Sequence, residues 1–114
     1  MRIFTAIFLL FAAASASAAC TRPGQAPTIP NGTKADEAEM AAGRAAIQAY
    51  VNELEAFQAC LNKQVEQATA DVPEQLKSAW TAEGDSAVDA ANVLANAYSA
   101  ALKTFKEKSA TPPK

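Results

Sequence analysis

The chain has 114 residues, half of them hydrophobic, no histidine and a formal net charge of −2. A mildly acidic balance argues against a nucleic-acid-binding protein, which needs a basic face, and the lack of histidine removes the commonest general base and metal ligand. A single domain of this size buries only about 60–65% of the surface of its unfolded chain, so a covalent cross-link or a partner would add much to its stability.

Residues 1–18 are typical of a secretory signal peptide. Arg2 supplies a positive charge, residues 3–11 are apolar with one exception, and a run of alanine and serine follows. The apolar segment is far shorter than the roughly 20 residues that span a bilayer. Cleavage before Ala19 or before Cys20 satisfies the small-residue rule. We therefore expect an exported protein, periplasmic or secreted, that keeps a net charge of −3 after cleavage.

Residues 19–33 are predicted to be extended. Three prolines fall within eight positions: Pro23, Pro27 and Pro30. Because proline disrupts helices, this spacing favours a polyproline II path. Asn31 and Gly32 then indicate a turn.

A first helix is predicted over about 34–70, where good helix formers dominate. Thr33 with Asp36 matches a helix-start signal, and the acidic residues that follow suit the helix dipole. Apolar residues recur at steps of three, four and seven and form one stripe. The stripe consists of Met40, Ile47, Tyr50, Val51, Leu54, Phe57, Leu61, Val65 and Ala68.

A second helix is predicted over about 72–108, since Asp71 followed by Glu74 is another capping signal. Its stripe has the same spacing and consists of Leu76, Trp80, Ala87, Ala91, Leu94, Ala95, Tyr98, Leu102 and Phe105. Gly84 lies inside this pattern, where we expect a continuous helix, although a kink would also fit. Residues 111–114 are expected to form a disordered tail.

The predicted fold is all-α, an antiparallel two-helix hairpin over 34–110 with the extended segment along the first helix. Folding the chain at the short connection brings Leu54 opposite Ala91, and apolar positions meet along the whole length. Two helices alone make a thin core. We expect a monomer in which the proline segment covers part of this core, with a weak four-helix homodimer as the alternative.

Cys20 and Cys60 are the only cysteines. An extended path from Cys20 to Lys34 spans about 43 Å at the polyproline II rise. The helix from Lys34 to Cys60 spans about 39 Å. If the extended segment turns back at Asn31 and Gly32, it therefore ends beside Cys60. In an oxidising compartment this predicts a disulfide, which would stabilise the fold by about 4 kcal/mol in the chain-entropy model.

Two other states of Cys20 stay open. It could carry a lipid, as the first mature residue of bacterial lipoproteins does. Ala18 and Ala19 fit that motif, but Ser17 stands where a leucine is usual. Acylation would anchor the protein to the outer membrane and leave Cys60 unpaired. A free or intermolecular thiol is the third possibility.

The layout of these residues resembles a group of small exported helical proteins of Gram-negative bacteria. The motifs are Cys20-x-x-Pro23, Ile29-Pro30-Asn31-Gly32, Glu39-Met40, Tyr50, Cys60-Leu61, Ala87-Val88-Asp89 and Phe105-Lys106. The resemblance would cover nearly all of the predicted mature chain. It implies a periplasmic location and supports the cysteine pairing. The group has no assigned activity, so the resemblance supplies no function.

No motif for chemistry emerges. The chain has neither a Cys-x-x-Cys pair nor a glycine-rich phosphate loop. Glu53 and Glu55 are two residues apart on a helix and point to different sides. The aromatic residues Tyr50, Trp80 and Tyr98 lie on the apolar stripes, which predicts core packing. We therefore expect no enzyme, no cofactor, no metal site and no nucleic-acid partner.

Three hypotheses for the function follow. The first is a non-catalytic structural or protein-interaction component of the cell envelope, which meets an unknown protein partner through a helical face. The second is a lipoprotein of the outer membrane, anchored through acylated Cys20; this is the only route to a membrane that we expect. The third is a chaperone-like or small-ligand-binding periplasmic protein.

Overall fold

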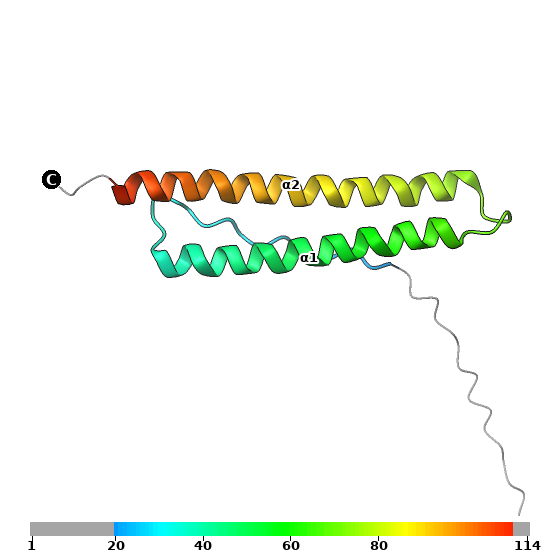
Figure 1. The fold of residues 1–114 in the computed structure, drawn as a ribbon, viewed down its shortest axis with the longest axis horizontal. Coiled ribbons are helices and arrows are strands. Elements are labelled where there is room, and N and C mark those ends of the chain that lie inside the picture. The colour runs from blue at the N-terminus through cyan, green and yellow to red at the C-terminus, as the bar shows by residue number, and fades with distance from the viewer. Residues whose placement is uncertain (1–19, 111–114) are drawn as a thin grey trace, which may run out of the picture.

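The computed structural model describes residues 20–110 and shows an antiparallel helical hairpin (Figure 1). Helix α1 spans Glu37–Gln67 and helix α2 spans Glu74–Ala110. The described part of the chain contains no strand, so the predicted all-α hairpin is confirmed. The predicted signal peptide, 1–18, and the predicted tail, 111–114, lie outside the described residues.

Helix α1 begins at Glu37 and not at 34, because a different capping pair sets its start. The Asp36 side chain accepts a hydrogen bond from the Glu39 backbone N–H at 2.8 Å, and the Glu39 carboxylate accepts one from the Asp36 N–H at 2.9 Å. This reciprocal pair is a capping box. Thr33 belongs instead to the preceding turn, where its N–H donates to Oδ1 of Asn31 at 2.9 Å.

Helix α1 ends at Gln67 rather than at 70. The next residue, Ala68, has extended backbone angles of φ −64° and ψ 128°, and its N–H donates to the Val65 carbonyl at 3.2 Å. The chain then uses residues 68–73 to reverse direction before α2 begins at Glu74, which shortens α1 at this end.

Helix α2 begins at Glu74 rather than at 72 and continues to Ala110 rather than to 108. Val72 stays in the connection, where its N–H bonds to the Thr69 carbonyl at 3.0 Å. A residue that precedes a proline disfavours helical backbone angles, so Val72 cannot open the helix. The Pro73 carbonyl accepts the first intrahelical bonds.

The core follows the predicted stripes. Leu54, Phe57 and Leu61 of α1 form a buried cluster with Ala87 of α2. Tyr50, Trp80, Ala90 and Ala91 pack around this cluster. Gly84 lies inside the uninterrupted α2, as expected, and is buried against α1. A Cβ built on it would lie 3.9 Å from Leu61, an ordinary packing distance.

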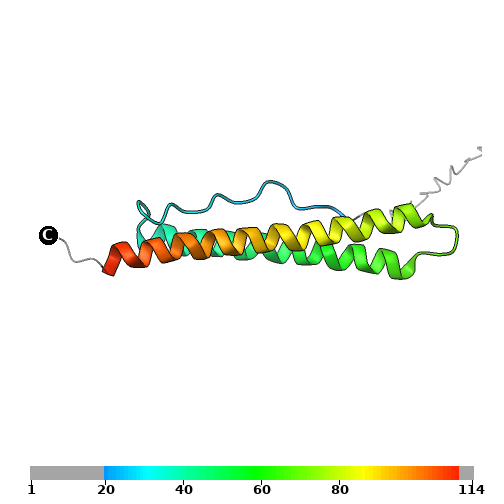
Figure 2. The same cartoon turned by 90° about the horizontal axis from the view of Figure 1, so that it is seen from above.

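Residues 20–34, which we call the strap, run over one side of the hairpin without helix or strand as far as Asn31 and then form a turn over 32–34. Figure 2 shows the strap on a single side of the two helices. We call the opposite side the open face. The molecule therefore has two different faces, one covered by its own chain and one formed by helices alone.

Candidate functional site

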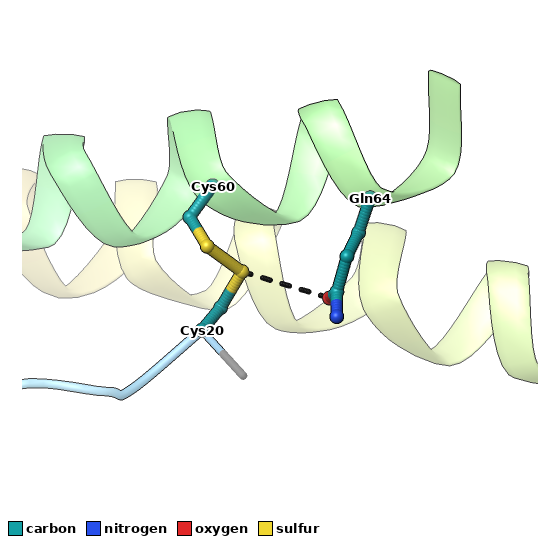
Figure 3. Close-up of a disulfide and its surroundings, with 3 residues drawn as sticks. All are labelled: Cys20, Cys60 and Gln64. Carbon is teal, nitrogen blue, oxygen red and sulfur yellow. Dashed lines mark hydrogen bonds between the residues drawn. A yellow bond between two sulfur atoms is a disulfide. The ribbon is translucent and has the colours of Figure 1, made fainter. Parts of the chain in front are cut away.

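A disulfide joins Cys20 at the start of the strap to Cys60 of α1, with their Cα atoms 5.7 Å apart (Figure 3). The described residues include no free cysteine. Oε1 of Gln64 lies 3.6 Å from Sγ of Cys20. A disulfide sulfur has no proton to donate, so this contact adds packing around the bridge. The two predicted site residues, Cys20 and Cys60, are thus brought together, and the bridge anchors the strap at its first residue.

Arg22 extends the strap across the gap between the helices. Its guanidinium carbon lies 6.0 Å from the centre of the Phe57 ring on α1, at the outer limit of a cation–π contact. The same guanidinium donates two hydrogen bonds, of 3.5 and 3.4 Å, to Oγ of Ser86 on α2. The strap therefore contacts both helices and not only α1, to which the sequence analysis had confined it.

The first residues of the strap, 20–24, pack on the flank of α1 that carries Glu53 and Cys60. Pro23 and Phe57 line the same surface hollow there. The hydroxyl group of Tyr50 donates a hydrogen bond to the Gly24 carbonyl at 2.8 Å. This bond ties the strap to α1 between its two ends.

Pro30 and Gly43 are in direct contact where the strap approaches the start of α1. A Cβ built on Gly43 would overlap Cγ of Pro30. A glycine inside a helix lowers its stability by about 1 kcal/mol relative to alanine. Here it makes room for the proline ring.

Gly32 brings the strap against the backbone of α2. A Cβ built on Gly32 would overlap the Ala101 carbonyl and would lie 3.1 Å from the backbone nitrogen of Phe105. Gly32 is itself buried. The Asn31 carbonyl, which accepts hydrogen bonds from Lys34 and Ala35 at 3.0 and 2.7 Å, then turns the chain toward α1.

The open face carries a groove between the two helices. Its lining includes Val51, Leu54, Gln58, Val88, Ala91 and Ala95. At 100° per residue, Val51 and Gln58 lie on the opposite side of the Leu54 stripe from Phe57 and Cys60, which hold the strap. Val88 remains 37% exposed, although it is a large apolar side chain. The strap therefore leaves this apolar groove uncovered.

Two further hollows continue the groove toward the ends of the molecule. Val65, Lys77 and Thr81 line the one near the connection. Glu37 and Leu102, with Met40, Arg44 and Tyr98, line the one at the other end. The open face is thus a long surface with an apolar middle and charged residues near its ends.

The arrangement offers contact surface rather than reactive groups. Within residues 20–110, no three side chains of the kinds His, Cys, Asp and Glu cluster closely enough to hold a metal ion. The described helices also include none that is long and apolar enough to cross a membrane.

A hydrogen bond also links the two helices beside the open face. The hydroxyl group of Tyr98 on α2 donates to the Met40 carbonyl of α1 at 3.2 Å.

Comparison with known protein families, with curated proteins and with solved structures finds no match to this chain. The resemblance to small exported proteins therefore stays a prediction. The function has to be argued from the molecule's own geometry.

Sequence reasoning found the two cysteines but missed the contacts between the strap and α2. Arg22 and Ser86 are 64 positions apart, and neither belongs to a motif. Gly32 did carry a signal, because a glycine at a turn often marks a place where another group approaches the backbone closely. The sequence could not say that α2 would be the neighbour.

Proposed function

We propose that this protein is an exported, disulfide-stapled helical protein of the cell envelope that acts without catalysis by binding another protein. The proposal combines the secretory character of residues 1–18 with a rigid hairpin that presents a contact face.

The disulfide supports the proposed location. Structural disulfides persist in oxidising compartments such as the periplasm and the extracellular space, and they are rare in the cytosol. The bond between Cys20 and Cys60 also competes with the lipoprotein alternative. A sulfur bonded to Cys60 cannot hold a thioether-linked lipid, so a single molecule has one or the other.

The open face is the single observation that carries the binding role. Val88 is exposed in the middle of a groove whose floor contains Leu54, only 1% exposed. Exposed apolar surface flanked by polar side chains is typical of protein contact sites. Glu55, Gln58 and Asn92 provide such a polar border here. A groove of this shape suits side chains of another protein better than a deeply enclosed small molecule.

Site-specific photo-crosslinking tests the proposal. A photoreactive amino acid placed at Val88 should give a discrete protein adduct when the chain is exported by the cells that produce it. The matched control is Asn96, which is exposed in the same helix but outside the groove. Equal adduct yields from the two positions, or none from Val88, would contradict a binding role for the open face.

A further inference from the structure

We infer that the open face binds a second copy of this chain, so that two hairpins pack face to face as a four-helix bundle. The inference rests on the proposed binding role of the open face and names its partner. The two copies are related by a two-fold axis parallel to the helices, which places α1 of each copy against α2 of the other. Both connections then lie at the same end of the bundle.

The open face is large enough for a stable homodimer. Helix α1 has 31 residues, which at 1.5 Å each gives a length of about 46 Å. Two helices side by side are about 20 Å wide, so the face covers roughly 900 Å². Stable protein–protein interfaces bury about 800 Å² on each partner. Val51 and Val88 would lose their remaining exposure in the centre of such a contact.

The distribution of charge favours this orientation of the two copies. The start of α1 and the end of α2 lie at the same end of the hairpin (Figure 1). Glu37, at the start of α1, lines the open face, and Lys106, near the end of α2, lies at the same helical angle as Val88. When α1 faces the partner copy's α2 at the same height, Glu37 of one copy meets Lys106 of the other. Both copies form this contact, so it occurs twice.

The alternative two-fold axis, perpendicular to the helices, would pair like charges. With that axis, α1 would lie antiparallel to the other copy's α1, and α2 would lie antiparallel to the other copy's α2. Glu37 would come near Glu66 of the other copy, and Lys106 would come near the other copy's Lys77. Like charges across an interface oppose binding and select against a wrong arrangement. The parallel axis avoids both contacts.

The strap explains why assembly stops at two copies. A contact between identical faces is self-complementary and closes on itself. A third copy would need another open face, but the strap occupies the other side of each hairpin. The two straps would lie on the outside of the bundle, each held by its own disulfide.

Sedimentation velocity over a range of concentrations tests the inference. The oxidised chain without residues 1–18 should convert from monomer to dimer as its concentration rises. Val88→Glu should raise the dissociation constant of the dimer at least about tenfold, because it buries a charge in the contact. The matched control is Val93→Glu, since Val93 is 67% exposed on α2 but does not line the groove. A dimer that tolerates Val88→Glu as well as Val93→Glu would overturn the inference.

Mixing two charge variants tests the orientation. Glu37→Lys alone and Lys106→Glu alone each place like charges across both symmetric contacts, so each should dimerise about threefold or more weakly than the original chain. An equimolar mixture should recover the original affinity, because the heterodimer restores opposite charges at both contacts. A mixture no tighter than the separate variants would overturn the parallel axis.

The two proposals can fail separately. A chain that remains monomeric up to about 500 μM, about five hundred times a dissociation constant of 1 μM, overturns the homodimer. If Val88 still crosslinks to a different protein in cells, the proposed binding role stands. If Val88 crosslinks to nothing, both proposals fail.

Discussion

Because glycine has no Cβ, it allows the segments of this molecule to approach one another closely at certain positions. Gly43 and Gly32 let the strap touch the helices, because a Cβ at either position would overlap a neighbouring atom. Gly84 lies in an equally regular helix but has ordinary packing distance around it. The three glycines therefore differ in how a methyl group added at each position would affect stability.

Gly84→Ala and Gly43→Ala should change the free energy of unfolding in opposite directions. Gly84→Ala should stabilise the protein by up to about 1 kcal/mol, because alanine favours the helix and its methyl group fits against Leu61. Gly43→Ala should destabilise it by about 1 kcal/mol or more, because the methyl group displaces the rigid Pro30 ring. Urea denaturation of both variants measures the two changes.

Gly24→Ala is the control for these substitutions, since nothing lies within 4 Å of a Cβ built there. It should change stability by only a few tenths of a kcal/mol. If Gly43→Ala proved as stabilising as Gly84→Ala, the strap would not pack on α1 in solution as described.

At the scale of elements, the strap supplies the third layer that two helices lack. It has little regular hydrogen bonding of its own, and it is held at intervals by contacts that it makes with the hairpin. The disulfide fixes its first residue, the Tyr50 hydroxyl holds Gly24, and the Gly32 backbone lies on α2. Because these contacts involve both helices, the strap also holds the helices together.

Reduction of the disulfide, or Cys60→Ser, should lower the melting temperature by at least about 10 °C while circular dichroism at low temperature still shows two helices. A cross-link closing a loop of this length contributes up to about 4 kcal/mol, chiefly by restricting the unfolded chain. Without the disulfide, α1 keeps its capping box and both helices keep their buried stripes. The double variant Cys20→Ser, Cys60→Ser should match the single variant, and an unchanged melt would show that the bridge is absent in solution.

At the scale of the whole molecule, the two faces of the hairpin have different uses. The strap side is completed within the chain, whereas the open face is available to another protein. This asymmetry connects the fold to the proposed binding role, because a symmetric two-helix rod would have no reason to form a closed dimer.

If the protein is exported as proposed, its intact mass should correspond to the chain without residues 1–18, less two hydrogens for the disulfide. Cleavage before Cys20 instead of Ala19 would lower the mass by one alanine residue. Reduction and alkylation should then add two alkyl groups, one each at Cys20 and Cys60. A mass increased by acyl chains, with alkylation at Cys60 alone, would establish the lipoprotein alternative.

Local sequence determined much of this protein. Stripes of apolar residues such as Leu54, Phe57 and Leu61 predicted the helices. Their helical spacing repeats over many residues, so a single residue that does not fit the pattern does not change the prediction. Proline spacing excluded a helix before Asn31. Segment lengths brought Cys20 to Cys60, since polyproline II and helix each have a fixed rise per residue.

Only the tertiary structure decided where the helices end, where the strap lies and which face stays open. Thr33 and Asp36 are both acceptable caps, and in the structure Asp36 is the cap while the Thr33 backbone N–H belongs to the turn at Asn31. The contacts of Arg22 and Gly32 with α2 depend on how the two helices sit against each other. That arrangement arises from side chains far apart in the chain, and no local pattern encodes it.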